Sequence, residues 1–339
     1  MKITMNHIAR QTGVSRTTVS LVLKGEAGRY RITPATAARV TAAARRLGFQ
    51  PNYIARALSQ GATRVVGVVV PNMSDVFLGD ILKGIEQVLH DAGYMMILCT
   101  SRYDRETERK NTDLLVAHGV DGILMTFNAP FKGASYDYSH LKQLVAKQPN
   151  TVFIDRRLPS LRAPSVVLDD ILAARTATAR LLQDRRSPGF ISLDLDVSSI
   201  GDRLRGFYQA CRAARIRPQE RHLVFLGPDQ QDEGSVRGIL ADRFTGAAPD
   251  CLLVSTGRLA FRVKNALESL GYRTGSDIAL AKFGADPDHN RSGMLCVDQR
   301  HADMGREAAL LLLKMIAGGR RLKSADRHVV LKPVIIDGK

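Results

Sequence analysis

The residues best suited to chemistry lie in the segment 15–24, where polar and basic side chains share one face of an expected helix. Arg16, Thr17 and Lys24 fall on that face, opposite an apolar stripe. Guanidinium, ammonium and hydroxyl groups side by side on one face suit contact with a polyanion. The chemistry that this face favours is binding to a polyanionic partner rather than catalysis.

Three short helices are expected to position that face. The first covers 5–12, and Gly13 supplies the turn after it. Ser15 can cap the second helix, over 16–24. A third helix covers 34–47 and begins with proline, which suits the first helical position. Two short helices joined by a glycine turn, the second polar and basic on its outer face, are typical of a helix-turn-helix.

The basic charge of the chain is concentrated at its N-terminus. The 339 residues carry a formal net charge of +16. Residues 1–64 hold eleven Lys and Arg against one acid, a net +10, and the other 275 residues carry the remaining +6. Such a segment favours a polyanionic partner. A solvated basic face is the alternative that composition alone leaves open.

The rest of the composition excludes several classes of protein. No apolar run reaches the roughly 18–20 residues of a membrane span, and the N-terminus lacks the apolar stretch of a signal peptide. The four cysteines are scattered, which disfavours zinc ribbons and disulfide scaffolds. No P-loop, Gly-x-Gly-x-x-Gly, Gly-x-Ser-x-Gly or metal-ligand cluster occurs. We therefore expect a cytoplasmic protein that is not an enzyme and needs no metal or cofactor.

From residue 65 onward the pattern changes to alternating strands and helices. Residues 65–70 form a continuous apolar run, as in a strand buried on both faces. Further strands are expected at 94–99, 122–126, 151–154 and beyond, with helices between them. This alternation predicts an α/β body of doubly wound parallel sheets in two lobes, with ligands beyond the carboxyl ends of the strands.

The N-terminal motifs resemble a known family. Residues 8–20 resemble the DNA-binding signature of the LacI/GalR family of bacterial repressors, and residues 48–58 resemble its hinge segment. The stretch 25–33 is longer than in the lactose repressor and resembles the fructose and sucrose operon repressors. The resemblance implies an all-α helix-turn-helix domain followed by a two-lobed effector domain similar to periplasmic sugar-binding proteins.

The resemblance also implies DNA-contacting roles. Arg16 and Thr17 would read base edges, whereas Leu21 could only contact a thymine methyl group or nothing. Leu58 matches the leucine that the family wedges into the minor groove; a place in a local core is the alternative. Any single Ser or Thr could instead be a helix cap. The residues assigned to DNA are Thr4, Ser15, Arg16, Thr17, Thr18, Ser20, Leu21, Lys24, Asn52, Ala55 and Leu58.

Three segments follow from this reading. Residues 1–50 form the DNA-binding domain, 51–62 a hinge helix, and 63–339 the effector-binding and dimerisation domain. Within the last, we expect one lobe from about 63–163 plus 298–326, and the other from about 164–293 plus the C-terminal strand.

The loops after the body's strands supply the effector-binding candidates. Carboxylates and arginine can bind sugar hydroxyls, and an aromatic ring can cover an apolar sugar face. Loop-capping or salt-bridging roles are the alternative for each residue. The set is Asp75, Phe77, Arg102, Thr126, Asp155, Arg156, Ser199, Arg203, Thr256, Lys282 and Gly284.

Two departures from the family pattern bear on the effector. Thr256-Gly257 stands where most members have Asn-Asp, and Phe283-Gly284-Ala285 stands where most have Phe-Asp-Asp. A missing carboxylate beside several basic residues favours an anionic ligand. A sugar phosphate or sugar acid is therefore a hypothesis beside a neutral sugar.

The implied mechanism is repression of a carbohydrate-utilisation operon by a homodimer on a pseudo-palindromic operator. A small carbohydrate-derived effector would shift the equilibrium between two arrangements of the lobes. No heptad tail follows the body, so a dimer is expected. The alternative is a transport-type sugar-binding protein without DNA function, which residues 1–60 disfavour.

Overall fold

The computed structural model describes residues 3–49, 61–73, 76–133, 136–158, 160–161, 163–284, 293–318 and 327–338. The chain divides into two compact units, Met1–Thr63 and Arg64–Lys339. Residues 51–60 of the expected hinge helix lie outside the described residues.

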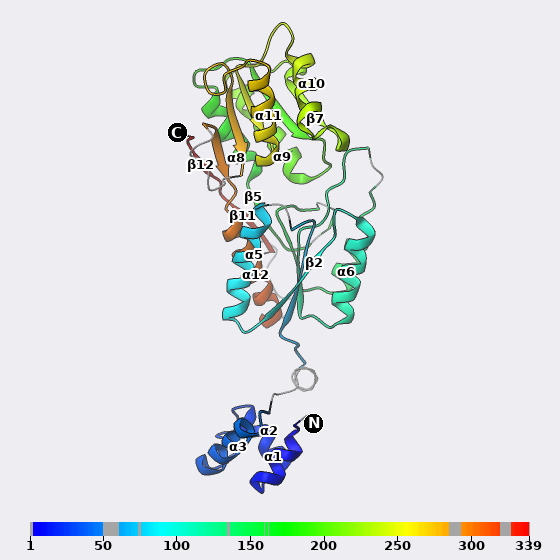
Figure 1. The fold of residues 1–339 in the computed structure, drawn as a ribbon, viewed down its shortest axis with the longest axis vertical. Coiled ribbons are helices and arrows are strands. Elements are labelled where there is room, and N and C mark those ends of the chain that lie inside the picture. The colour runs from blue at the N-terminus through cyan, green and yellow to red at the C-terminus, as the bar shows by residue number, and fades with distance from the viewer. Residues whose placement is uncertain are drawn as a thin grey trace. The chain divides into compact units, whose positions relative to one another are not determined.

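Residues 3–49 of the first unit form three helices, labelled in Figure 1: α1 (Met5–Thr12), α2 (Arg16–Leu23) and α3 (Pro34–Arg46). Gly13 adopts the left-handed region at φ 66°, which lets the chain turn between α1 and α2. Ile8, Val19 and Val40, one from each helix, are fully buried in a common core. These helices and the turn at Gly13 confirm the predicted helix-turn-helix. Their shared core determines which face of α2 stays exposed.

The first sheet of the second unit has the order β11-β5-β4-β3-β1-β2 within the described residues. Its strands are β1 (Val65–Val70), β2 (Met95–Thr100), β3 (Gly122–Met125), β4 (Thr151–Ile154), β5 (Ser165–Leu168) and β11 (His328–Leu331). Every pairing in it is parallel. The apolar run over 65–70 is the interior strand β1, with neighbours on both sides, as its sequence predicts.

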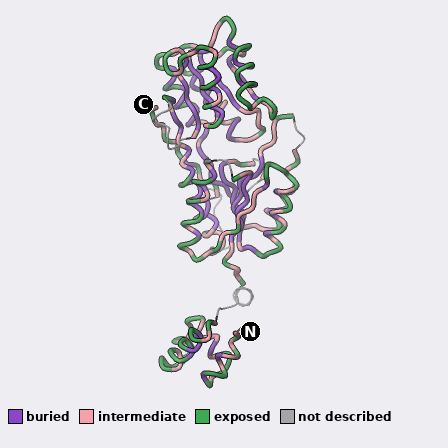
Figure 2. The backbone as a smooth tube through the Cα atoms, in the orientation of Figure 1, coloured by how far each residue is buried: buried purple, intermediate pink, exposed green. Residues whose placement is uncertain are grey.

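The second sheet has the order β12-β10-β9-β8-β6-β7. Its strands are β6 (Pro188–Leu193), β7 (Leu223–Leu226), β8 (Cys251–Val254), β9 (Ala279–Phe283), β10 (Leu295–Asp298) and β12 (Val334–Ile336). Among these described strands, only β12 runs antiparallel to its neighbour, which is β10. Interior strands such as β1, β4 and β8 are almost wholly buried, whereas the edge strand β2 has exposed residues (Figure 2).

Helices pack against each sheet. Those of the first lobe are α5 (Val76–Asp91), α6 (Arg105–Ala117), α7 (Ser139–Lys147) and α12 (His301–Gly318). Those of the second lobe are α8 (Asp170–Leu181), α9 (Ser198–Ala213), α10 (Glu233–Phe244) and α11 (Gly257–Ser269), with 3-10 turns at Glu220–His222 and Pro228–Gln230. The fold class predicted from the sequence is confirmed.

Glycine allows α5 and α12 to touch backbone to backbone. A Cβ on Gly84 would lie 2.0 Å from the carbonyl oxygen of Ala302, and one on Gly305 would lie 2.0 Å from that of Ile81. Any side chain at these two positions would force the helices apart.

The expected lobe boundary differs from the structure in two places. β5 pairs with β4 in the first sheet, so the first lobe continues to Leu168 rather than ending near 163. The C-terminal strand-like segment is two strands in different sheets, β11 in the first and β12 in the second. Pro333 lies between them and has no N–H to continue a ladder, which explains the break.

Candidate functional site

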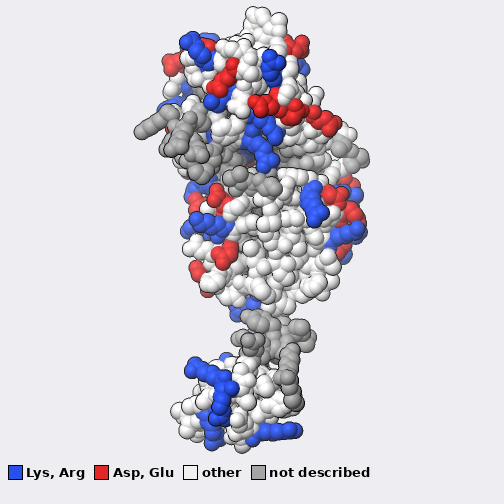
Figure 3. Space-filling view, viewed as in Figure 1, with Lys and Arg blue, Asp and Glu red and all other residues white. Residues whose placement is uncertain are grey.

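The outer face of α2 has the exposure that DNA recognition needs. Arg16, Thr17 and Lys24 are exposed, whereas Val19 is fully buried beneath them. In Figure 3 the visible surface of the first unit shows Lys and Arg and no Asp or Glu. Leu21 is half-buried, so little of its side chain remains for a base contact.

Two of the hydroxyls assigned to DNA are engaged in capping. The Ser15 Oγ accepts a hydrogen bond from the Thr18 amide at 3.0 Å and lies 2.9 Å from the Thr18 Oγ1. Both side chains therefore shape the start of α2, where they also border the exposed Arg16. Ser20 is half-buried on the same helix.

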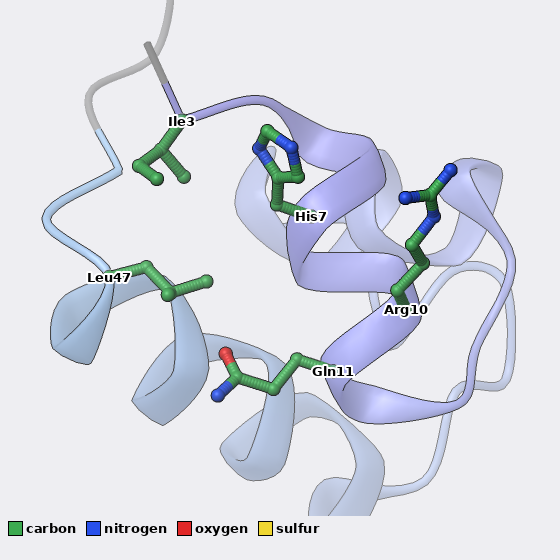
Figure 4. A pocket seen from close by; sticks show the side chains of 5 residues that line it. All are labelled: Ile3, His7, Arg10, Gln11 and Leu47. Carbon is green, nitrogen blue, oxygen red and sulfur yellow. The ribbon is translucent and has the colours of Figure 1, made fainter. Parts of the chain in front are cut away.

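Thr4 lies at the start of α1, beside a depression on the first unit. The Thr4 amide donates a hydrogen bond to Nδ1 of His7 at 3.1 Å, a reciprocal cap in which histidine takes the usual place of glutamate or glutamine. The depression has a volume of about 500 Å³. Its lining residues, shown in Figure 4, are Ile3, His7, Arg10, Gln11 and Leu47. The remaining DNA assignments, Asn52, Ala55 and Leu58, fall outside the described residues.

Arg203 is the centre of the cleft candidates. Its Nε lies 2.7 Å from Oδ1 of Asp170, and its two terminal nitrogens donate to the Ser255 carbonyl and to Oε1 of Gln299, each at 2.6 Å. Its guanidinium also lies 4.0 Å from the centroid of the Phe283 ring. Arg203 is only 5% exposed, so it is held in place before any ligand arrives.

Asp170 is fully enclosed beside that arginine. Burial raises the pKa of Asp170 to about 6, although the Arg203 charge acts in the opposite direction. The pair joins α8 to α9 across 33 residues of sequence.

Asp155 follows β4 in a conformation that few non-glycine residues adopt. Its φ is 70°, and its Oδ2 lies 3.2 Å from Nε of Arg156. Arg156 also donates to the Phe127 carbonyl at 2.9 Å. A left-handed residue at the carboxyl end of a strand is a feature that clusters at ligand sites.

Phe77 stacks near a buried histidine at the same edge. The Phe77 and His301 rings lie 5.2 Å apart. Burial lowers the pKa of His301, against the opposing charge of Asp155. The charge of Arg203 also lowers the pKa of His301. His301 therefore lies among three of the candidates, Asp155, Phe77 and Arg203.

Other candidates have different surroundings. Lys282 is fully buried, with Nζ 3.0 Å from the Gly284 carbonyl and 4.9 Å from the centroid of the Phe261 ring on α11. Its neighbour Phe283 contacts Arg203 instead, because successive strand residues point to opposite faces. Arg102 is exposed at φ 54°.

The smaller candidates lie at strand and helix ends. Ser199 is buried one helical turn before Arg203. The Oγ1 of Thr126 is buried and lacks a hydrogen-bond partner among the described residues. Thr256 precedes α11, and Gly284 adopts φ 99° after β9. Asp75 is outside the described residues.

Sequence reasoning missed four residues that surround Arg203. Three are Asp170, Gln299 and Phe283, which contact it directly. The fourth is His301. Asp170 and Gln299 each follow a strand, which was the available signal; their pairing with Arg203 depends on contacts across 33 and 96 residues.

A cavity of about 410 Å³ adjoins this cluster where the lobes meet. Asp155 lines it, together with Arg157, Ser198 and Asp202. The Arg157 amide donates to the Ser198 Oγ at 3.2 Å, so the two lobes are in contact at the cavity. Arg203 is not among its lining residues.

Known families match both units. The periplasmic binding proteins and sugar binding domain of the LacI family match residues 63–330, and the bacterial regulatory proteins of the lacI family match residues 4–52. The chain belongs to the lacI family of bacterial regulatory proteins. The match of residues 4–52 disfavours the transport-type alternative.

Individual relatives share this organisation. The transcriptional regulator GalR of Salmonella typhimurium is 32% identical over 228 residues, which cover 67% of this chain and 64% of the relative. The chain thus spans about 64% of the length of the GalR relatives it matches. The regulator KdgR of Bacillus subtilis is 26% identical over 341 residues, covering 98% of this chain and 96% of the relative.

Solved structures share the fold. The lac repressor dimer bound to operator and the anti-inducer ONPF has a TM-score of 0.83 at 18% identity, covering 99% of this chain and 98% of that one. The regulator CelR in complex with cellobiose has a TM-score of 0.68 at 24% identity, with the same coverage.

Two kinds of feature are absent from the described ranges. No helix there is long and apolar enough to cross a membrane. No group of three or more His, Cys, Asp or Glu side chains in those ranges could hold a metal ion.

Proposed function

We propose that this protein is a sequence-specific DNA-binding regulator of a carbohydrate-utilisation operon, controlled by a small effector bound between its two lobes. The observation that carries the proposal is the outward face of α2, where Arg16 and Thr17 are exposed above a buried Val19. GalR and KdgR are named as transcriptional regulators, which supports the same role.

Operator selection from fragments of the source genome tests DNA recognition. We expect one preferred sequence with two related half-sites, and we expect Arg16→Ala to reduce its preference over a mismatched site by about 1–3 kcal/mol. Arg39→Ala, at an exposed position on α3, is the control. It should weaken binding to the preferred and the mismatched site equally. Equal affinity of the natural protein for all fragments at low salt would refute sequence-specific binding.

We infer that the effector is held by the cluster around Arg203, Asp155 and Phe77. CelR binds cellobiose, which supports a carbohydrate ligand in this fold. Two of the basic residues that could attract an anion already have acidic partners. Arg203 pairs with Asp170, and Arg156 pairs with Asp155. This compensation favours a hydroxyl-rich ligand over a strongly charged one.

Calorimetric titration with neutral sugars, sugar phosphates and sugar acids tests that preference. Neutral sugars are expected to bind more tightly than their phosphates. The reverse order would restore the anionic-effector hypothesis. Asp155→Asn should weaken binding of whichever compound binds, and Asp113→Asn, at a half-buried position on α6, should not.

We also infer a homodimer. Met95 and Ile97 on the edge strand β2 are 56% and 37% exposed, an unusual setting for large apolar side chains. The lac repressor structure is that of a dimer, and an operator of two half-sites would need one here. Sedimentation equilibrium should give twice the chain mass, and Ile97→Asp should shift the protein toward monomer.

A further inference from the structure

The two lobes are joined by a short backbone pairing away from the places where the chain crosses between them. The Lys132 amide donates to the Asp194 carbonyl, and the Asp196 amide donates to the Pro130 carbonyl, each at 2.8 Å. Phe131 and Leu195 face each other between these bonds in an antiparallel bridge. Segments 130–132 and 194–196 therefore form a miniature two-stranded ladder between lobes.

Side chains add to this pairing. The Lys132 Nζ lies 3.2 Å from Oδ1 of Asp194 and 5.2 Å from the centroid of the Phe225 ring. The ion pair is largely exposed, so its electrostatic contribution is small. The two backbone hydrogen bonds are the stronger part of the pairing.

Each arm of the ladder is anchored in its own lobe. On the second lobe, the Asp194 amide donates to the Leu226 carbonyl at 2.9 Å, at the end of β7. On the first lobe, the amide of Asn128 donates to Oε2 of Glu108 at 2.6 Å. Asn128 precedes the ladder residue Pro130 by only two positions, so Glu108 sets where the arm leaves the first lobe.

Glu108 is a buried acid that the DNA surface and the Arg203 cluster do not use. Its side chain is fully buried on α6. Its Oε1 lies 2.8 Å from Nε2 of His140 on α7 and 3.4 Å from the hydroxyl of Tyr136. Burying a carboxylate costs free energy unless its oxygens accept hydrogen bonds. Here one of those hydrogen bonds is donated by the backbone of the arm.

We propose that this pairing is a clasp that holds the two lobes in the arrangement seen here, with Glu108 as its positioning residue. The clasp forms in the absence of effector and DNA. If the proposed effector control is correct, effector binding that separates the lobes has to break this clasp. Each net backbone hydrogen bond shifts such an equilibrium by about two- to tenfold.

Residue-resolved hydrogen exchange on the full-length protein, without effector or DNA, tests the clasp. The Asp196 amide should be protected because it donates across the lobes. Lys132→Pro removes one donor and should speed exchange at Asp196 by about tenfold. Lys132→Ala keeps the N–H and loses only the side-chain contacts with Asp194 and Phe225, so its effect should stay within about threefold.

A second amide distinguishes a clasp from a local contact. Arg157 donates to Ser198 across the lobes at a different place. If the clasp holds the lobes together, Lys132→Pro should also speed exchange at Arg157 by about two- to tenfold. The Ile191 amide, inside β6, serves as the folding control and should stay protected.

Variants of Glu108 test the positioning role. Glu108→Ala should speed hydrogen exchange at the Asp196 amide. Glu108→Gln should keep that amide protected, because the side-chain amide oxygen can still accept a hydrogen bond from the Asn128 amide. Three results would overturn the proposal: rapid exchange at Asp196 in the natural protein, an Arg157 amide indifferent to Lys132→Pro, or Asp196 protection unaffected by Glu108→Ala in a protein whose Ile191 amide stays protected.

Discussion

The surface on α2 and the cluster around Arg203 hold their functional groups in opposite ways. On α2 the side chains point outward, and their supports are close in sequence, as when Ser15 caps the amide three residues away. Around Arg203 the groups point inward, and their partners lie 33 to 96 residues away. One surface is built from local rules and the other from tertiary contacts.

This difference determines how each region should fail. A change on the local surface costs one cap or one exposed side chain and leaves its neighbours in place. A change in the buried cluster leaves other buried polar groups without partners, which is far more costly. The predictions below separate the two kinds of failure.

The largest effect is expected at Arg203. Arg203→Leu would leave the Asp170 carboxylate buried without its counter-ion, and the free energy of unfolding should fall by about 3–5 kcal/mol at pH 7.5. Arg205→Leu on the same helix is the control, since its ion pair with Asp202 is exposed on the arginine side and is worth at most about 1 kcal/mol. Urea denaturation measures both. Equal losses would show that the cluster is no more interdependent than the surface.

A pH dependence of about 2–3 kcal/mol is expected next, at Asp170. The pKa of Asp170 is raised from 3.8 to about 6, so the folded state binds its proton more readily than the unfolded state does. This stabilisation is fully present below pH 3.8 and is lost as the pH rises through 6. Asp170→Asn should remove that component from the unfolding free energy measured between pH 4 and 7. An unchanged pH profile in the variant would mean that Asp170 does not titrate in this range.

A smaller, local effect is expected at the start of α2. Ser15→Ala removes the acceptor for the Thr18 amide and should destabilise the helix by about 1 kcal/mol. Hydrogen exchange at Thr18 should report the change, while amides of the second unit stay as they were. Thr17→Ala, exposed and outside the cap, is the control. A loss that spread to the Arg203 cluster would contradict the local character of this surface.

The smallest effect is expected at Lys24. If this exposed ammonium contacts one phosphate, Lys24→Ala should lower the slope of log affinity against log salt by about 1, without changing sequence preference. Lys142→Ala, exposed on α7 of the second unit, should leave the slope unchanged. Titrations at several salt concentrations measure both. A change in sequence preference at Lys24 would assign it to base contact instead.

The same contrast explains what the sequence could predict. The α1–α2 turn at Gly13, the cap at Ser15 and the buried run of β1 follow from neighbours within a few residues, and each is confirmed. Arg203 was singled out, but its partners Asp170 and Gln299 were not, because nothing local links these positions.

Two other outcomes depended on information beyond local pattern. β5 belongs to the first sheet because it pairs with β4, and β11 belongs to it because it pairs with β5. Pairing partners that are distant in sequence leave no periodic signal. Lys282 is expected near the cleft because it lies close to the carboxyl end of a strand, yet the alternation of strand side chains turns it toward Phe261.

The pairing of β11 with β5 has a consequence for how the protein forms during synthesis. His328 lies opposite Ser165, so the edge strand of the first lobe emerges from the ribosome only after every strand of the second lobe except β12. The first sheet must therefore wait, incomplete at that edge, while the second lobe forms. Such late closure slows folding and leaves β5 exposed to incorrect partners in the interval.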